Sequence, residues 1–227
     1  MQRSVAHVRW AHPSGGGRRA ARPVCDSPAL LRRRDLEVLA WVAEQYAARV
    51  DQLEMLMGCG PRTVQRTLAR MREAELITTR RVLAGEPAWV FPTAKGLRAC
   101  GSTFGVWSPR IGLLAHVVAV NDVRLYVRAR SSGSEWIPER VLARDRRAGE
   151  HLPDGVVLTD RQRVAVEVEL TVKSRRRVTG ILDELSGRFD AVVYFCAPGP
   201  YRLLSEFAGT GRWPRLDVRQ LPASQEV

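Results

Sequence analysis

Apolar residues recur with helical spacing in three successive stretches between residues 27 and 76. The first follows Ser27-Pro28, a typical helix start, and the second, VDQLEMLMG, ends at Gly58, a typical helix stop. The third begins at Gly60-Pro61. The positions predicted to face inward are Leu36, Leu39, Ala43, Tyr46, Ala47, Leu53, Leu56, Met57, Val64, Leu68 and Met71. This spacing predicts three amphipathic helices in a row.

Two β-prone runs follow in ITTRRVLAGEPAWVFPT, on either side of residues 84–87, and they predict a β-hairpin. Thr93 is then predicted to cap a short helix, AKGLRACG. Three helices followed by a hairpin make a winged helix-turn-helix, to which we assign residues 27–100. The third helix, the hairpin and the PTAKGLRA exit resemble those of many bacterial winged-helix DNA-binding domains.

The third predicted helix carries polar and basic residues mostly off its apolar stripe, an arrangement suited to the major groove of double-stranded DNA. Two arginines on the hairpin could reach backbone phosphates. The residues predicted to bind DNA in this domain are Arg62, Thr63, Gln65, Arg66, Arg70, Arg80 and Arg81. The alternative is that this helix face is simply solvated.

The second half of the chain predicts an α/β sheet with helices on its faces. Residues 101–112, rich in Gly, Ser and Pro, form the expected linker, and LLAHVVAVNDVRLYVRAR predicts a mostly buried helix. Its dense apolar positions are Leu113, Val117, Val120, Val123, Leu125 and Val127. The further elements, in order, are strands in SEWIPERVLA, DGVVLTD and RVAVEVELTVK, a helix in RRVTGILDELSGR, a strand in AVVYFCAP, a helix in YRLLSEFA and a strand in RLDVRQL. We assign residues 113–222 to this domain and residues 223–227 to a tail.

Two carboxylates interrupt the most apolar of these strands. Glu167 and Glu169 share one face of the strand, since alternate residues point the same way, while the valines between them face the opposite side. A hairpin turning at residues 159–162 would bring Asp154 level with Glu167. Such acids are tolerated if they are solvated, paired with Arg or bridged by a cation, and their oxygens suit Mg²⁺ or Mn²⁺. Asp154, Glu167 and Glu169 are therefore the candidate metal ligands.

The charge balance points to a polyanionic partner. The chain has 36 Lys and Arg against 24 Asp and Glu, a net charge of +12, so double-stranded DNA is the expected partner. Residues 1–26, rich in Gly, Arg and Pro, are predicted to be a disordered basic arm. Without a membrane-length apolar run, a secretory signal or paired cysteine spacings, we expect a cytoplasmic, nucleoid- or plasmid-associated protein with no membrane, zinc or disulfide chemistry.

The acids and their surroundings resemble the PD-(D/E)xK nuclease superfamily, in which a PD dipeptide precedes an acid pair on the next strand of an αβββαβ unit. With VNDVRL, WIPER, HLPDG and VEVELTVKS, residues from about 30 to 220 are similar to the replication-relaxation family of plasmids and mobile elements. The resemblance implies a restriction-endonuclease-like C-terminal domain in an α+β chain. It also implies that Asp154 and Glu167 are catalytic metal ligands.

One position departs from that family pattern, because Glu169 stands where most members have Lys. Lys173, the candidate replacement, lies on the same strand face but roughly 13 Å further along. It could act in catalysis only after a bulge or if the strand ends early; otherwise it would meet phosphate together with Arg175, Arg176 and Arg177. Other candidate site residues are Asp122 or Glu139 as a further acid and His151 as a proton shuttle, each with a plain surface role as the alternative.

Two functions follow as expectations. The first is a DNA-binding protein that nicks or cleaves DNA with Mg²⁺ or Mn²⁺ during replication, relaxation or transfer of a plasmid or mobile element. The second is a transcriptional or replication-accessory regulator whose nuclease-like fold is degenerate. A homodimer and replication or transfer proteins stay open as further partners. A winged-helix sensor of a small molecule would leave the acids followed by basic residues unexplained.

Overall fold

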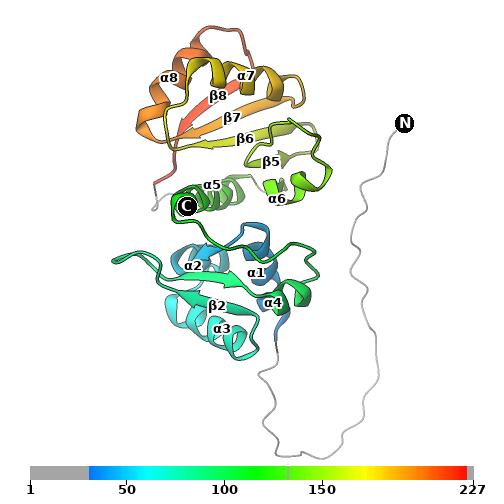
Figure 1. Ribbon diagram of the computed structural model, residues 1–227, viewed down its shortest axis with the longest axis vertical. Coiled ribbons are helices and arrows are strands. Elements are labelled where there is room, and N and C mark those ends of the chain that lie inside the picture. Colours follow the sequence, from blue (N-terminus) through cyan, green and yellow to red (C-terminus); the bar gives the residue numbers. More distant parts are fainter. Residues whose placement is uncertain (1–30, 132, 224–227) are drawn as a thin grey trace, which may run out of the picture.

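The computed structural model describes residues 31–131 and 133–223 (Figure 1). The predicted basic arm at residues 1–26 and the residues Ser27-Pro28 lie outside these ranges. The first helix was expected to run on from Ser27-Pro28, but it begins only at Arg33, because the backbone of Arg32 is extended. The protein is a mixed α/β molecule with two sheets, as the apolar pattern predicts. Among the described residues, none of the helices is long and apolar enough to cross a membrane.

The N-terminal unit contains the three expected helices and the hairpin. Its elements are α1 (Arg33–Glu44), β1 (Ala48–Arg49), α2 (Val50–Met57), α3 (Pro61–Glu73), β2 (Ile77–Arg80), β3 (Trp89–Pro92) and α4 (Ala94–Ala99). The strands form an antiparallel sheet in the order β1-β3-β2. The inward stripe of α3 is confirmed, since Val64, Leu68 and Met71 are fully buried in the core shared with α1 and α2.

Local chemistry explains where these helices start and stop. Gly58 ends α2 in the left-handed conformation, with φ of 55°, and Pro61 occupies the first turn of α3. The Thr93 hydroxyl caps α4 by accepting a hydrogen bond from the Gly96 N–H at 3.0 Å. Gly96 has no room for a side chain, because a Cβ there would lie 2.0 Å from the Leu76 carbonyl oxygen.

The prediction for the end of the first helix was wrong. α1 stops at Glu44, and Tyr46 adopts a left-handed backbone with φ of 69°, so neither Tyr46 nor Ala47 is helical. The short strand β1, which this turn makes possible, was not predicted. Ala47 is nevertheless buried, and Tyr46 packs against Trp107 with ring centroids 5.3 Å apart.

The C-terminal unit is built on a five-stranded sheet. Its elements are α5 (Ile111–Arg130), β4 (Glu135–Pro138), α6 (Glu139–Leu142), the 3-10 turn η1 (Ala143–Asp145), β5 (Gly155–Leu158), β6 (Arg163–Glu169), α7 (Arg175–Ser186), β7 (Ala191–Cys196), α8 (Pro198–Gly209) and β8 (Leu216–Gln220). The strand order is β4-β5-β6-β7-β8, antiparallel from β4 to β6 and parallel from β6 to β8.

Two of the predicted strands are shorter than expected. The strand in SEWIPERVLA stops at Pro138, after which the chain turns into α6. The strand in RVAVEVELTVK stops at Glu169, so the alternation of faces does not continue to Lys173. Both differences matter for the site, because they redirect the chain at one end of the sheet.

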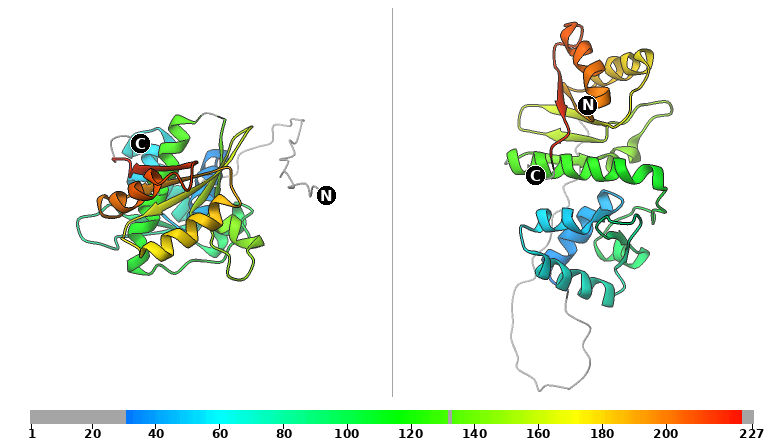
Figure 2. Two further views of the ribbon diagram at one scale, coloured as in Figure 1. Left: turned by 90° about the horizontal axis from the view of Figure 1, so that it is seen from above. Right: turned by 90° about the vertical axis from the view of Figure 1, so that its left-hand side faces the viewer.

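Helices cover both faces of this sheet (Figures 1 and 2). Val166 and Val168 pack toward α5, whereas Ala165 packs with the residues of α7 and α8 on the other face. Glu167 and Glu169 share the face of Ala165 and are only 4% and 5% exposed. The acids are therefore buried rather than part of a solvated face.

Helix α5 lies between the two units, as Figure 2 shows in its right-hand view. Leu125 belongs to the core of the N-terminal unit, and Val123 belongs to the core under the C-terminal sheet. Leu113 was expected in this core but is 46% exposed, while its neighbour Leu114 is buried at 1%. A buried polar contact joins α5 to α2, since Asn121 Nδ2 donates to Gln52 Oε1 at 3.0 Å.

Candidate acid cleft

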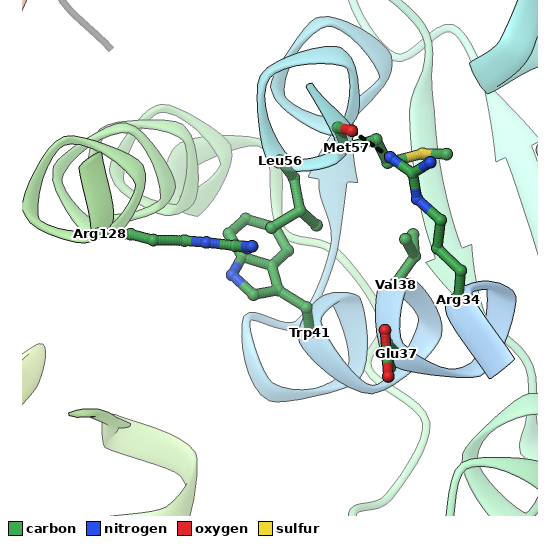
Figure 3. Close-up of a pocket in the computed structure, with 7 residues that line it drawn as sticks. All are labelled: Arg34, Glu37, Val38, Trp41, Leu56, Met57 and Arg128. Carbon is green, nitrogen blue, oxygen red and sulfur yellow. Dashed lines mark hydrogen bonds between the residues drawn. The ribbon is translucent and has the colours of Figure 1, made fainter. Parts of the chain in front are cut away.

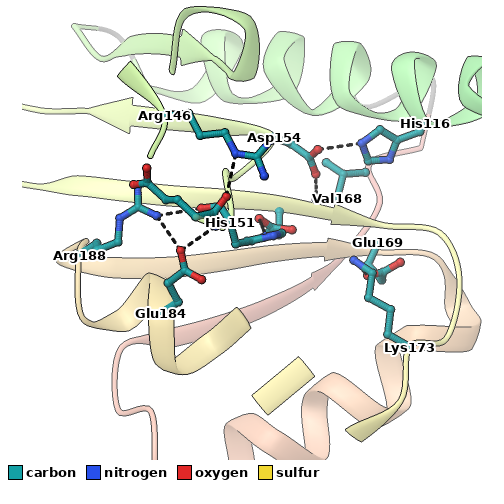
Figure 4. Close-up of polar contacts among 11 residues, drawn as sticks. His116, Arg146, His151, Asp154, Val168, Glu169, Lys173, Glu184 and Arg188 are labelled. Atoms are coloured by element: carbon teal, nitrogen blue, oxygen red, sulfur yellow. Dashed lines mark hydrogen bonds and ion pairs between the residues drawn. The ribbon is translucent and has the colours of Figure 1, made fainter. Parts of the chain in front are cut away.

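A cleft of about 270 Å³ opens where β5 begins and β6 ends. Figure 4 shows the polar side chains around it. We call it the acid cleft; it is lined by His116, Glu139, Arg146, His151, Leu152, Asp154, Glu167, Val168 and Lys173. Asp154, Glu167 and Lys173, which were predicted from the sequence, therefore meet in one place. Glu139 and His151, two of the open candidates, also lie here.

Asp154 sits immediately before β5. Gly155 pairs with Val166 in the β5–β6 ladder, so Asp154 lies beside Glu167, as the hairpin predicts. One carboxylate oxygen of Asp154 accepts a hydrogen bond from the Val168 N–H at 2.7 Å, taking the place of a ladder bond. The other lies 2.7 Å from Nε2 of His116 on α5. Backbone and helix together therefore fix this carboxylate.

Glu167 is held by a histidine from the loop before β5. Its Oε1 lies 2.9 Å from Nε2 of His151. That loop is itself anchored, because the His151 N–H donates to Glu184 on α7 at 2.7 Å and Arg188 donates to the His151 carbonyl at 2.8 Å. The buried carboxylate thus faces a positioned imidazole.

Glu169 pairs with Lys173. Since β6 ends at Glu169, the chain folds back, and Lys173 Nζ lies 2.5 Å from Glu169 Oε2. Figure 4 places this pair on the opposite side of the sheet from His116 and Asp154. The early strand end is the condition under which Lys173 could reach the cleft. Lys173 does line it, although Glu169 occupies the position expected for a lysine.

Burial and the charge of a neighbouring acid raise the pKa values of two acids in the cleft. Burial raises the pKa of Glu167, and the charge of Asp154 raises it further, although His151 opposes both effects. The pKa of Glu139 is also raised, by burial first and then by Asp154. Burial lowers the pKa of His116, but the hydrogen bond and charge of Asp154 outweigh it and leave that pKa above its usual value. The cleft therefore concentrates negative charge in a poorly hydrated place.

The two candidates for a further acid lie in different places. Glu139 lines the acid cleft and accepts a hydrogen bond from the Tyr46 hydroxyl at 3.3 Å, so the N-terminal unit reaches into the site. Asp122 faces α2 instead, where Gln52 Nε2 donates to its carboxylate at 2.6 Å. Only Glu139 is placed to act with Asp154.

The donor chemistry of the cleft suits a hard divalent cation, because Asp154, Glu167 and Glu139 all present carboxylate oxygens to it. Burial and the neighbouring charge of Asp154 raise the pKa of Glu167 and of Glu139, and a cation would favour the ionised form of both. Each predicted ligand is at present paired with a basic group. Within the described residues, no three His, Cys, Asp or Glu side chains form a group that could hold a metal ion.

The predicted DNA-binding residues fall into two groups. Arg62, Thr63, Gln65 and Arg66 on α3 are exposed, as are Arg80, Arg81, Arg176 and Arg177. Arg70 and Arg175 are engaged within the protein. Arg70 binds the buried Asp35 through two nitrogens, at 2.8 and 3.2 Å, and Arg175 forms an ion pair with Glu206.

No family model, curated protein or solved structure matches this chain.

His116, Arg146 and Tyr46 were not predicted from the sequence as site residues, and His116 is the one that contacts a candidate metal ligand. It is separated from Asp154 by 38 positions, so no local spacing connects the two. The available signal was weak: His116 is the one polar side chain between Leu113 and Asn121, in an otherwise apolar run. Its side chain is 38% exposed, and its partner is Asp154, the candidate catalytic acid.

Proposed function

We propose that this protein binds double-stranded DNA through α3 and the β2–β3 hairpin, acting as a winged helix-turn-helix, and hydrolyses phosphodiester bonds at the acid cleft with Mg²⁺ or Mn²⁺. In keeping with its resemblance to the replication-relaxation family, the proposed setting is replication, relaxation or transfer of a plasmid or mobile element in the cytoplasm. A restriction-endonuclease-like C-terminal unit is part of the same proposal. Its order of α5, three antiparallel strands, α7 and β7 supports that assignment.

The exposed face of α3 is the observation that carries DNA binding. Arg62 and Arg66 are one turn apart, and the first turn of the helix contains no acid. Like charges at this spacing repel, and positive charge near a helix N-terminus is unfavourable. Phosphate contacts would reverse both effects, and Thr63 and Gln65 beside them offer hydrogen bonds to base edges.

The hairpin continues this basic surface. Arg80 and Arg81 are exposed at the end of β2, and the Arg80 guanidinium lies 4.6 Å from the centre of the Phe91 ring. A hairpin next to a groove-reading helix can contact the flanking backbone, where arginine forms paired hydrogen bonds to phosphate. We assign Arg81, which has the freer side chain of the two, to such a contact.

The acid cleft supplies the proposed chemistry. Asp154 and Glu167 would hold the cation, which when bound polarises a phosphate and favours ionisation of water. Lys173 brings a positive charge to the same cleft, suited to stabilising the charge that develops on the phosphate. His151, hydrogen-bonded to Glu167, is placed to move a proton. Arg176 and Arg177, exposed at the start of α7, extend positive charge beyond Lys173 for the DNA backbone.

A second candidate is a regulator with the same DNA-binding surface and no hydrolysis. The pairing of the acids favours it, because His116, His151 and Lys173 each contact one carboxylate, so the acids have partners without a metal ion. In that case the cleft stabilises the fold, and Glu169 marks a lost active site.

A cleavage assay with supercoiled plasmid distinguishes the two functions. At protein concentrations where a gel shift shows binding, we expect Mg²⁺ or Mn²⁺ to convert the plasmid to nicked or linear forms. Asp154→Ala and Glu167→Ala should abolish this conversion while binding survives. Asp160→Ala, which removes an exposed acid from the β5–β6 turn, is the matched control and should cleave normally.

If the plasmid stays intact with both ions while the protein demonstrably binds it, hydrolysis is refuted. The regulator function is then supported. A protein that does not shift DNA even at low salt refutes both functions, because each depends on the α3 surface.

A further inference from the structure

A second cavity lies toward the far end of α5 from His116. It has a volume of about 280 Å³ and is walled by Trp41 of α1, Arg124 and Arg128 of α5, and Trp136 of β4; we call it the indole groove. An adjoining cavity of about 210 Å³ shares Trp41 and Arg128 with it. Figure 3 shows Arg128 reaching from α5 to the Trp41 indole. The groove therefore joins the N-terminal unit, α5 and the edge of the C-terminal sheet.

Three of the residues that line the indole groove carry a buried hydrogen-bond donor without a partner in the described part of the chain. Of the six buried side-chain N or O atoms without a partner among the described residues, three belong to its walls: Trp41 Nε1, Arg124 Nη1 and Trp136 Nε1. Trp41 is only 7% exposed. Buried N–H groups almost always have an acceptor, and an indole N–H can only donate. The walls of this one cavity thus hold three donors for which the described residues supply no acceptor.

The charges around the groove are predominantly positive. Arg124 and Arg128 are one helical turn apart, and Arg124 is matched by Glu44, whose carboxylate lies 2.7 Å from Nη2. Arg128 is exposed, and no described residue pairs with it. Glu37 lines the adjoining cavity, but its carboxylate is bound to Arg33 at 2.9 Å. The positive charge of Arg128 is therefore available to an anion.

The aromatic walls are fixed by packing. The Arg124 guanidinium carbon lies 5.2 Å from the centre of the Trp41 ring. The Trp136 ring lies directly on Gly155, where a Cβ would be 2.2 Å from Cζ2 of the indole. A ligand that bonds these N–H groups would therefore meet a preformed set of donors.

We propose that the indole groove binds a phosphate group. Its donors come from α1, α5 and β4, and the several oxygens of a phosphate can accept from different directions, whereas a carboxylate offers two oxygens in one plane. The phosphate is either free, as inorganic phosphate or a small phosphate ester, or belongs to a DNA backbone. The site is distinct from the acid cleft, because Arg128 lies roughly 18 Å along α5 from His116.

Calorimetric titration of the metal-free protein with inorganic phosphate tests this site. We expect saturable binding of one phosphate per chain that weakens at least tenfold in Arg128→Gln and in Trp136→Phe. Arg110→Gln, the same charge change on an exposed residue at the start of α5, should leave the affinity unchanged, as should Arg66→Ala on α3. Thermal unfolding checks that each variant is folded.

A second titration identifies the source of the phosphate. If inorganic phosphate displaces a short DNA duplex from the wild type more effectively than from Arg128→Gln, the groove binds a backbone phosphate. If phosphate binds without displacing the duplex, it binds a free phosphate ligand. Absence of saturable binding in the millimolar range, or equal weakening in Arg110→Gln and Arg128→Gln, overturns the proposal.

Discussion

The basic face of α3 and the acid cleft hold their charges in opposite ways. On α3, Arg62 and Arg66 are exposed, whereas Asp154 and Glu167 in the cleft and Glu169 beside it each contact a basic residue of the protein, at distances of 2.5 to 2.9 Å. Exposed charges are hydrated and contribute little to stability, while buried pairs depend on both members. Substitutions on the α3 face should therefore change the affinity for a binding partner. Substitutions in the buried pairs should change the stability of the fold.

The same contrast occurs within α3 itself, between Arg66 and Arg70. Arg66 points outward, whereas Arg70 reaches back to α1 and binds Asp35, which is 1% exposed. Two arginines four residues apart on one helix thus have different roles. Substituting Arg66 and Arg70 in turn therefore tests an exposed and an engaged position with the same residue type.

The largest effect is expected for Arg70→Ala. The substitution leaves the buried Asp35 carboxylate without its cation, which should lower the free energy of unfolding by about 3 kcal/mol. Urea unfolding followed by circular dichroism measures this change. The double variant Asp35→Ala/Arg70→Ala should lose less than the sum of the single variants. A loss below about 1 kcal/mol for Arg70→Ala would show that the pair is effectively solvated.

A slightly smaller effect is expected for Lys173→Met in the cleft. Glu169 would remain buried without a positive partner, at a cost of about 2–3 kcal/mol. Lys173 is 21% exposed at its side chain, so water can relieve part of that cost. Adding Glu169→Gln should restore most of the stability in the same urea experiment. The exposed Arg176→Ala on α7 is the control and should change it little.

Most of the fold follows from the sequence because its signals are local. The stripe of Val64, Leu68 and Met71, the Gly58 stop and the Thr93 cap each act within one or two helical turns, and each is seen in the structure. The end of α1 does not follow, because Tyr46 takes its left-handed backbone where it packs against Trp107, a tertiary contact. The end of β6 likewise depends on the chain folding back at Glu169.

For the candidate site, the residues within one hairpin were predictable and their partners were not. Alternation along β6 and the turn at residues 159–162 are sufficient to align Asp154 with Glu167. His116 comes from a helix on the opposite face of the sheet, and Tyr46 comes from the N-terminal unit. Contacts of this kind depend on how the two units pack around α5, which no periodicity in the sequence encodes.

On the exposed side of the comparison, Arg66→Ala should weaken DNA binding about tenfold, because it removes one groove contact. Its stability should change by less than about 0.5 kcal/mol, as is usual for surface positions. Fluorescence anisotropy with a labelled duplex measures the affinity. Arg202→Ala on α8, also exposed, is the matched control and should bind like the wild type. Equal affinity in both variants would contradict the groove-reading role of α3.

The smallest effect is expected for Arg81→Ala on the hairpin. A single backbone contact adds about 0.9 to the slope of log affinity against log salt concentration, so the variant should show a slope lower by that amount. Its affinity loss should be clear at low salt and shrink as salt rises, because both proteins then bind weakly. Arg161→Ala, at the exposed β5–β6 turn, should keep the wild-type slope. An unchanged slope for Arg81→Ala would mean that the hairpin does not touch phosphate, and DNA contact would then be confined to α3.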